Sequence, residues 1–369
     1  MKLACVEILR LNMPLVTPFR TSFGVQTGRD VLIVVAETTD GVRGFGECVA
    51  LADPIYNEEY VEGAQQVLER YLIPAVLRAQ DITPAQVAVL TEGFVGHRMA
   101  KGALELAVLD AQLRTVGMSL ADYLGGVRRT VQVGVSVGIT DTTEQLVEVV
   151  GAFRTQGYKR VKLKIEPGFD IEPVAAVREA FGSDLALQVD GNTAYRAGDL
   201  AHLTQLDSFG MLLIEQPFEH DALDLHSELA RRCVTPICLD ESLISAGITA
   251  TAIRQRACSI VNIKAGRMGG YLEARRAHDV ATALHTPVWC GGMLETGVGR
   301  AANLALASLP GFSLPGDISA SSRYYAEDIT EPFALVDGEI AVPLGPGLGV
   351  EIREPVLRDV LTSRRTVTD

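Results

Sequence analysis

Charged residues recur at nearly constant intervals through the middle of this chain. They are Lys162, Lys164, Asp190, Glu215, Asp240 and Lys264. From Lys164 onward the successive intervals are 26, 25, 25 and 24 residues, and each residue closes a short apolar run such as LALQVD or MLLIE. A strand followed by a helix has about this length, and a parallel strand buried on both faces reads as a continuous apolar run. We therefore expect these residues at the carboxyl ends of successive parallel strands, where barrel enzymes place their chemistry.

The three acids predict a metal site. A single acid at a strand end is usually a helix cap or a solvated loop residue. Three acids at matched depth in a barrel mouth repel one another unless a cation neutralises them. Three carboxylates suit Mg²⁺ or Mn²⁺, and the absence of histidine or cysteine at a matching strand end argues against zinc. We predict that Asp190, Glu215 and Asp240 bind a divalent metal ion.

The lysines predict proton transfer. Lys162 and Lys164 share one side of a strand, and Lys264 lies four strands further on. The alternative is that they only form stabilising ion pairs with the acids. A buried lysine is costly without a role, however, and neighbouring cations lower its pKa. A substrate carboxylate at the metal would have a lysine on each face, so that one lysine could remove the α-proton while the metal stabilises the enediolate.

Length and composition are compatible with a barrel enzyme. The chain has 369 residues, of which 47% are hydrophobic and 21% charged, which suits a large core and a second structural unit. The net charge of −13 argues against nucleic-acid and membrane partners. The six cysteines show no CxxC pair and no zinc spacing, which favours buried free thiols in a reducing cytoplasm. We expect no signal peptide and no membrane span.

The chain divides into three parts. Residues 1–125 predict an α+β domain, with a hairpin at TTDG followed by helices. Residues 126–320 predict the barrel, and the tail 321–369 predicts a hairpin that returns to the first domain. Pro315 makes the eighth barrel strand the weakest. The expected barrel strands are 131–137, 160–165, 185–190, 211–215, 236–240, 259–264, 287–290 and 313–317.

The motifs that contain these residues resemble a known family. KLK, DGN, EQP, DES and NIKAGRMGG are similar to the enolase superfamily, in its muconate-lactonising-enzyme-like subgroup. PFRTSFG, GHRMAKGALE, VSVGI, WCGGMLETGVGRAANLALASLP and LPGDISAS more closely resemble the N-succinylamino acid racemase (N-acylamino acid racemase) / o-succinylbenzoate synthase family. The resemblance runs from near residue 1 to about Val350. The glycine after Asp190 is a small variation on the more usual alanine.

The resemblance implies a fold and a mechanism. The fold is an α/β (β/α)₇β modified TIM barrel under an N-terminal α+β capping domain that the C-terminal tail completes. The cofactor is Mg²⁺, for which Mn²⁺ or another divalent cation can substitute. Lys164 and Lys264 would be the acid/base pair in racemisation, and Lys162 would hold the substrate carboxylate. A lysine base with Mg²⁺ is the known arrangement of this superfamily and is not an independent prediction. The family also implies a homo-oligomer.

Further residues are weaker candidates. For the substrate they are Gly291, Gly292 and Met293, which line the succinyl pocket in this family, Ser136, and Phe19, Phe23 and Tyr56 on loops that could close over the mouth. For support of the site they are Asn192, Glu241 and Arg267. Each has an ordinary alternative: a tight turn, a core hydroxyl, a core aromatic, a turn or helix-start residue, or a surface salt bridge.

Several functions remain open from the sequence. The leading interpretation is metal-dependent 1,1-proton transfer on N-succinyl amino acids, together with the dehydration that forms o-succinylbenzoate in the menaquinone pathway. A second is another reaction of the superfamily, such as dipeptide epimerisation or cycloisomerisation. A metal-free Schiff-base aldolase and a non-catalytic metal-binding barrel are the alternatives of a different class. The sequence leaves open the physiological reaction, the acyl group and the preferred side chain.

Overall fold

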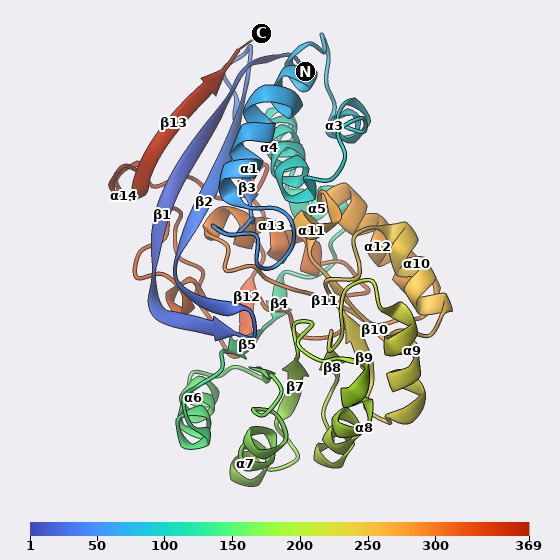
Figure 1. Cartoon of the computed structure of the whole chain (residues 1–369). Coiled ribbons are helices and arrows are strands. Elements are labelled where there is room, and N and C mark those ends of the chain that lie inside the picture. The colour runs from blue at the N-terminus through green and yellow to red at the C-terminus, as the bar shows by residue number, and fades with distance from the viewer. Residues whose placement is uncertain (369) are drawn as a thin grey trace.

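The computed structural model describes residues 1–368, so that Asp369 of the tail lies outside the described residues. An antiparallel sheet with the strand order β13-β1-β2-β3 forms one side of the capping domain (Figure 1). Its strands are β1 (Leu3–Thr21), β2 (Gly24–Thr38), β3 (Arg43–Cys48) and β13 (Leu361–Val367). The pairing of β13 with β1 confirms that the C-terminal tail completes this domain.

Helices cover the inner face of this sheet. They are α1 (Val61–Val67), a π-helical turn (Leu68–Leu72), α2 (Ile73–Leu77), α3 (Pro84–Leu90), α4 (Arg98–Val116) and α5 (Leu120–Leu124). The long helix α4 packs directly on β3 at Gly44 and Gly46. A Cβ atom on Gly44 would lie 2.1 Å from an α4 backbone atom, and a Cβ on Gly46 would lie 2.0 Å from one. The helix ends at Gly117, which has a φ of 70°. Only glycine at these β3 positions allows the helix to approach so closely.

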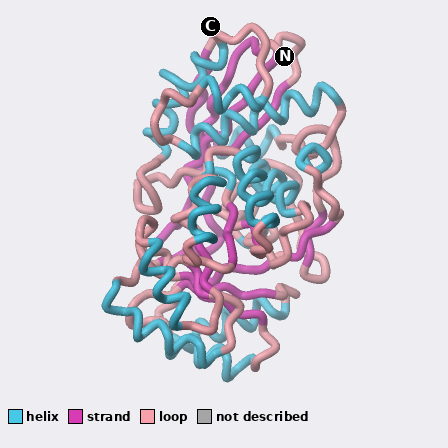
Figure 2. The backbone as a smooth tube through the Cα atoms, turned by 90° about the vertical axis from the view of Figure 1, so that its right-hand side faces the viewer, coloured by secondary structure: helices cyan, strands magenta, loops and turns pink. Residues whose placement is uncertain are grey.

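The second half of the molecule is a curled parallel sheet of seven strands in the order β11-β10-β9-β8-β7-β6-β5. The strands are β5 (Gly134–Val137), β6 (Arg160–Lys164), β7 (Ala186–Asp190), β8 (Ile214–Glu215), β9 (Ile237–Leu239), β10 (Ile260–Ile263) and β11 (Val288–Cys290). The connecting helices include α6 (Thr143–Thr155), α7 (Ile171–Phe181), α8 (Leu200–Leu203), α9 (Leu223–Arg232), α10 (Ala246–Arg254), α11 (Ala265–Met268), α12 (Tyr271–Ala283) and α13 (Gly297–Ala307). Figure 2 shows helices around these short strands and the long strands of the capping sheet above them.

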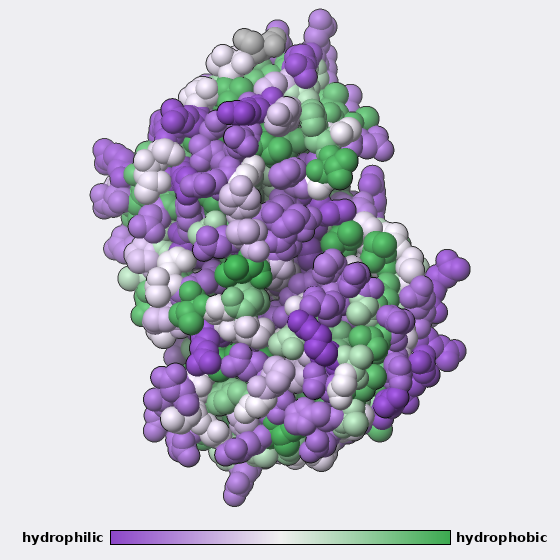
Figure 3. Space-filling model, in the orientation of Figure 1, coloured by the Kyte–Doolittle hydropathy of each residue, from purple (hydrophilic) through white to green (hydrophobic). Residues whose placement is uncertain are grey.

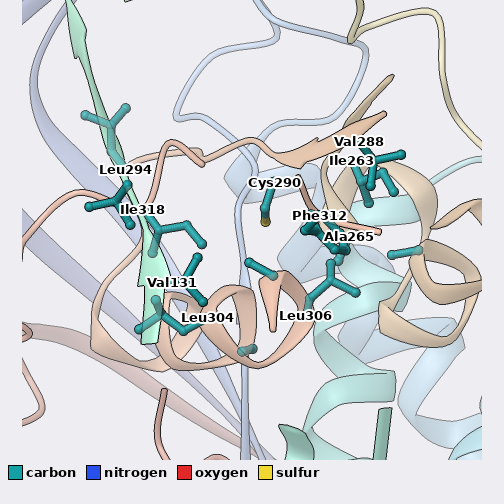
Figure 4. Packing of buried hydrophobic residues seen from close by; sticks show 14 of the residues in the cluster. Val131, Ile263, Ala265, Val288, Cys290, Leu294, Leu304, Leu306, Phe312 and Ile318 are labelled. Atoms are coloured by element: carbon teal, nitrogen blue, oxygen red, sulfur yellow. The ribbon is translucent and has the colours of Figure 1, made fainter. Parts of the chain in front are cut away.

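The predicted eighth strand forms only isolated bridges. Within 312–317, Phe312 bridges to β11 and Gly316 bridges to Val133, while the N–H of Asp317 donates to the carbonyl of Cys290 at 2.8 Å. Pro315 has no N–H and interrupts the ladder. The segment nevertheless lies between β11 and β5 and closes the barrel. Its flanking side chains and those of α13 belong to one apolar cluster (Figure 4).

Two other expectations need correction. The first predicted barrel strand is divided into β4 (Thr130–Gln132) and β5. The tail does turn tightly between Val336 and Glu339, but β12 (Glu339–Ala341) pairs with β4 at the barrel and not with the capping sheet. The edge of β4 has free backbone groups that β12 satisfies. The return to the capping domain comes later, through α14 (Glu354–Val360) and β13.

The face of the molecule drawn in Figure 3 is largely hydrophilic. On the face shown in Figure 3, apolar residues occur in separate small groups among polar ones. Within residues 1–368 no helix is both long and apolar enough to cross a bilayer.

Buried carboxylates of the capping domain bind the ends of barrel helices. Glu47 accepts hydrogen bonds from the N–H groups of Thr296 (3.0 Å) and Gly299 (2.9 Å) at the start of α13. Glu105 accepts one from the N–H of Leu272 (3.1 Å) at the start of α12. A helix N-terminus has unsatisfied N–H groups and favours negative charge. These contacts therefore fix the capping domain in position over the barrel.

We expect Glu105→Gln to reduce the pH dependence of stability. Burial raises the pKa of Glu105 to about 7 from an ordinary 4.5, opposed by backbone N–H groups of Leu272 and Tyr271 and by Arg276, and assisted by Glu273. The folded state then holds this proton more tightly than the unfolded chain does, so stability falls as pH rises from about 4.5 to 7. Glutamine removes this loss, which is on the order of 2 kcal/mol.

Urea unfolding at pH 5 and pH 8 measures this effect. The wild-type protein should lose more free energy of unfolding between the two pH values than the variant does. Other buried acids, such as Glu47, contribute equally to both proteins and cancel. Identical pH dependence in the two proteins would show that Glu105 does not bind a proton on folding.

Candidate active site

Strand β6 directs three cations into the barrel. Arg160, Lys162 and Lys164 alternate along it, and all three are buried. The parallel register places Lys164 opposite Asp190, and Asp190 opposite Glu215 on the next strand. The register alone thus brings a predicted base and two predicted metal ligands to the same level of the barrel.

Lys164 lies between an acid and an amide. Its Nζ donates to Asp190 Oδ2 at 2.6 Å and to Asn192 Oδ1 at 2.6 Å. Burial lowers the pKa of Lys164. The nearby charge of Lys162 lowers it further, while the charge of Asp190 partly raises it. Burial would raise the pKa of Asp190, but the charges of Lys164 and Lys162 keep it well below its ordinary value. The site thus lowers the pKa of Lys164 beside a carboxylate that stays ionised.

Lys264 lies between a different acid and a tyrosine. Its Nζ donates to Asp240 Oδ2 at 2.7 Å and to the Tyr56 hydroxyl at 3.2 Å. Burial alone would lower the pKa of Lys264, but Tyr56 and the surrounding acids raise it. Arg267 binds the other oxygen of Asp240 and is 3% exposed, so the alternative that it forms a surface salt bridge is wrong.

Lys162 belongs to a buried ion network. Its Nζ lies 2.6 Å from Asp317, 3.1 Å from Glu215 and 3.1 Å from Asp190. Burial opposes the charge of Lys162, but these three carboxylates raise its pKa above the ordinary value. Asp317 also accepts from Arg160 at 2.6 Å. Lys162 is therefore a fixed positive charge.

The sequence analysis missed three buried residues that hold this site. Asp317 ends the closing segment, and Asn262 donates its Nδ2 to Glu215 Oε1 at 2.6 Å. Gln216 accepts the N–H of Asp240 at 2.9 Å and has a left-handed backbone with a φ of 33°. Each belongs to a motif already recognised, LPGDIS, NIK or EQP. Gln216 directly follows Glu215, and Asn262 precedes Lys264 by two residues, so polar residues near assigned ones were the available signal for these two.

The predicted aromatic residues separate into two groups. Phe23 and Tyr56 contact each other edge to face, with ring centroids 6.2 Å apart, and Tyr56 reaches Lys264. Phe19 is buried against Tyr324, with ring centroids 6.3 Å apart, and contacts neither lysine. Ser136 donates to Asp317 at 3.2 Å. Ser136 therefore supports the ion network beneath the site.

The segment after β11 passes close to Lys264. The Met293 sulfur lies 3.5 Å from the Lys264 amine, and Gly292 lies against the carbonyl of Asp317. A Cβ on Gly291 would lie 2.3 Å from Asn262 Oδ1 and 2.8 Å from Lys264 Cε. Only glycine fits there without displacing one of these side chains.

We therefore expect Gly291→Ala to impair catalysis more than folding. The added methyl group displaces Lys264, and a misplacement of about 1 Å can reduce a rate about a hundredfold. Turnover by the purified variant and its melting temperature would be compared with wild type. Gly198→Ala is a suitable control, because a Cβ at Gly198 meets no atom within 4 Å. Unchanged turnover in Gly291→Ala would show that the clash relaxes without moving Lys264.

A cavity of about 450 Å³ opens at the mouth of the barrel. The capping loop 54–59 forms one wall, and Glu241, Ile244 and Arg267 belong to the barrel side. Tyr56 lines this cavity and contacts Lys264, so it lies at the boundary between the cavity and the lysine. Movement of the Tyr56 side chain would open the cavity to the Lys264 amine.

The donor set at the strand ends fits a divalent cation. Within residues 1–368 no three acid, histidine or cysteine side chains already converge as metal ligands, and the three carboxylates instead contact the lysines. Hard carboxylate oxygens on adjacent strands are nevertheless the donors that Mg²⁺ prefers. Glu241 Oε2 is buried without a partner, and burial together with the charge of Asp190 raises the pKa of Glu241 to about 7. A nearby cation would relieve this excess of negative charge.

Comparison with known proteins identifies the class. Residues 4–125 match the family described as the mandelate racemase / muconate lactonizing enzyme N-terminal domain. Residues 145–356 match the enolase C-terminal domain-like family. The chain belongs to the mandelate racemase / muconate lactonizing enzyme family of the enolase superfamily, which confirms the resemblance and the fold class.

Individual members of the family show which of its enzymes this chain is similar to. The chain is 60% identical to an N-succinylamino acid racemase from Amycolatopsis over 364 residues, which cover 99% of each chain. It is 42% identical to the o-succinylbenzoate synthase of Bacillus subtilis, with 98% of each covered. A solved enolase-superfamily structure from Listeria innocua superposes with a TM-score of 0.95 at 37% identity, over 100% of this chain and 99% of that one.

Proposed function

We propose that this protein racemises N-succinyl (N-acyl) amino acids through abstraction of the proton α to the carboxylate. We propose that it also forms o-succinylbenzoate by dehydration, through the same enediolate. The observation that carries the proposal is that two buried lysines, Lys164 and Lys264, lie beside carboxylates on opposite sides of the barrel mouth. The similarity of the chain to an N-succinylamino acid racemase and to an o-succinylbenzoate synthase supports both reactions.

In this proposal Asp190, Glu215 and Asp240 hold a divalent cation, preferably Mg²⁺. When bound, the cation neutralises the negative charge that develops on the substrate carboxylate. Lys162, as a fixed cation, binds the same carboxylate and makes the α-proton more acidic.

The two lysines then divide the proton transfers between them. In racemisation, one of Lys164 and Lys264 removes the α-proton, and the other returns a proton to the opposite face. In the dehydration, Lys164 acts first as base and then as acid on one face, and Lys264 remains a cation beside the enediolate. The raised pKa of Lys264 suits that second role.

α-Proton exchange tests the proposal. Each enantiomer of N-succinylphenylalanine is incubated with the enzyme and Mg²⁺ in D₂O, and deuterium incorporation is followed by NMR. We expect exchange and racemisation from both enantiomers, loss of both on chelation with EDTA, and recovery with Mg²⁺ or Mn²⁺. N-Acetylphenylalanine should react more slowly if the succinyl group is recognised. Exchange from neither enantiomer contradicts the racemase proposal.

Dipeptide substrates test the competing reaction. A dipeptide epimerase from Cytophaga hutchinsonii shares the fold, with a TM-score of 0.91 at 24% identity. Exchange of a dipeptide at a rate above that of N-succinylphenylalanine would favour epimerisation of dipeptides. We also propose a homo-oligomer, on the family resemblance alone. The six free cysteines support a reducing cytoplasm as its location.

A further inference from the structure

Different residues hold the two lysine amines. Lys164 contacts Asp190 and Asn192, whereas Lys264 contacts Asp240 and Tyr56. Among residues 1–368 no side chain is hydrogen-bonded to both amines. The positions of the two bases can therefore be altered one at a time.

Asn192 has a fixed orientation between Lys164 and Glu241. Its Nδ2 donates to Glu241 Oε1 at 2.9 Å, and its Oδ1 accepts from Lys164 at 2.6 Å. When Lys164 is an ammonium and Glu241 a carboxylate, Lys164 only donates and Glu241 only accepts, so that pair of neighbours selects this orientation of the amide. All three side chains are at least nine-tenths buried.

The backbone at Asn192 is also specialised. Its φ is 40°, in the left-handed region, and its N–H donates to Asp190 Oδ1 at 2.9 Å. Asparagine and glycine adopt this conformation at low cost, whereas most residues do not. The backbone conformation therefore holds the side chain of Asn192 in a defined place at the end of β7.

A neutral amide suits this role. Asp190 also contacts Lys164, but Asp190 is a proposed metal ligand. Its carboxylate oxygens would therefore bind the metal ion as well as the lysine. Asn192 belongs to no proposed ligand set, so binding of a metal ion does not compete for its contact with Lys164. It also fixes the amine without adding a second negative charge that would hold the lysine protonated.

We infer that Glu241 and Asn192 form a positioning chain that serves Lys164 and not Lys264. This inference rests on the proposed two-base function. Disruption of the chain should affect the enantiomer that Lys164 deprotonates and leave the other enantiomer nearly unaffected. Net racemisation slows equally in both directions because its equilibrium constant is one, so only α-proton exchange shows the asymmetry.

The experiment compares exchange of the two enantiomers of N-succinylphenylalanine in D₂O. Lys164→Ala first identifies the enantiomer that Lys164 serves, as the one whose exchange is lost. In Asn192→Gly, which keeps the left-handed backbone, we expect exchange of that enantiomer to fall about ten- to a hundredfold, and exchange of the other by less than about threefold. Tyr56→Phe removes a contact of Lys264 and should shift the ratio in the opposite direction.

Glu241 provides an independent test. Glu241→Gln retains a carbonyl oxygen that can accept from Asn192 Nδ2, so the ratio of the two exchange rates should stay near the wild-type value. Glu241→Met retains the length but accepts no comparable hydrogen bond, and should reproduce the asymmetry of Asn192→Gly. An unchanged ratio in Glu241→Met would overturn the role given to Glu241.

Mn²⁺ affinity, measured by calorimetry, separates positioning of Lys164 from damage to the metal site. We expect the affinity of Asn192→Gly to stay within about threefold of wild type. Equal loss of exchange from both enantiomers, or a large loss of Mn²⁺ affinity, would overturn the inference while leaving the proposed function intact. Absence of exchange in the wild-type enzyme would instead remove the proposed function, and this inference with it.

Discussion

Replacement of either Lys164 or Lys264 with alanine should abolish racemisation while leaving exchange from one enantiomer. Lys164 and Lys264 lie on different strands, and their amines are held by Asp190 at 2.6 Å and by Asp240 at 2.7 Å. Lys162 also contacts Asp190, at 3.1 Å, but its raised pKa keeps it a fixed cation. Loss of a positioned acid/base group costs about 10²–10⁴ in rate. The surviving lysine can still remove a proton from the face that it reaches and return deuterium to the same face.

Circular dichroism follows racemisation and NMR follows exchange, for each enantiomer separately. The two variants should retain exchange for opposite enantiomers. Lys159→Ala is the matched control, because Lys159 precedes the same strand as Lys164 but is exposed. Racemisation at the wild-type rate in either active-site variant would rule out the two-base mechanism.

The second large effect concerns stability. Asp317→Ala should lower the free energy of unfolding by about 3–5 kcal/mol, because it leaves the buried Arg160 without its carboxylate and Lys162 without the nearest of its three carboxylates. Asp317 lies 2.6 Å from both Arg160 and Lys162, which are 0% and 2% exposed. Burial favours the neutral form of Asp317, but these two cations hold its pKa well below the ordinary value. The carboxylate is therefore ionised and central to the network.

Urea unfolding measures this loss directly. The control is Asp141→Ala, which breaks an exposed contact of 3.6 Å with Arg20 and should cost less than about 1 kcal/mol. Asp317→Asn keeps the shape and should have an intermediate effect. If Asp317→Ala costs no more than the control, the buried cations must have found other partners and the network is not essential.

The repeated strand–helix units of the barrel could be predicted from the sequence. Apolar runs that end in a charge predicted the positions of Lys164, Asp190 and Glu215, because a parallel strand has a fixed direction and its register has few choices. Side-chain alternation likewise placed Lys162 and Lys164 on one face. Such local rules carry through to the structure because neighbouring strands repeat the same geometry.

Contacts between segments that are distant in the sequence could not be predicted from it. Asp317 meets Arg160 only because the closing segment inserts beside β5, and Pro315 had made that segment the least certain strand. Gln216 reaches the N–H of Asp240 across two strand ends through an unusual backbone angle. The hairpin segment of the tail, which pairs with β4, was misplaced for the same reason, since nothing local distinguishes the edge of β4 from the edge of the capping sheet.

The pairing of β13 with β1 has a consequence for biosynthesis. The two strands that meet there are 352 residues apart at the contact between Arg10 and Thr362. The whole barrel is thus inserted within the capping domain, and the ribosome must release nearly the entire chain before the outer edge of that domain can form. A nascent chain would expose the unpaired edge of β1 throughout translation, which is the kind of edge that recruits chaperones or aggregates.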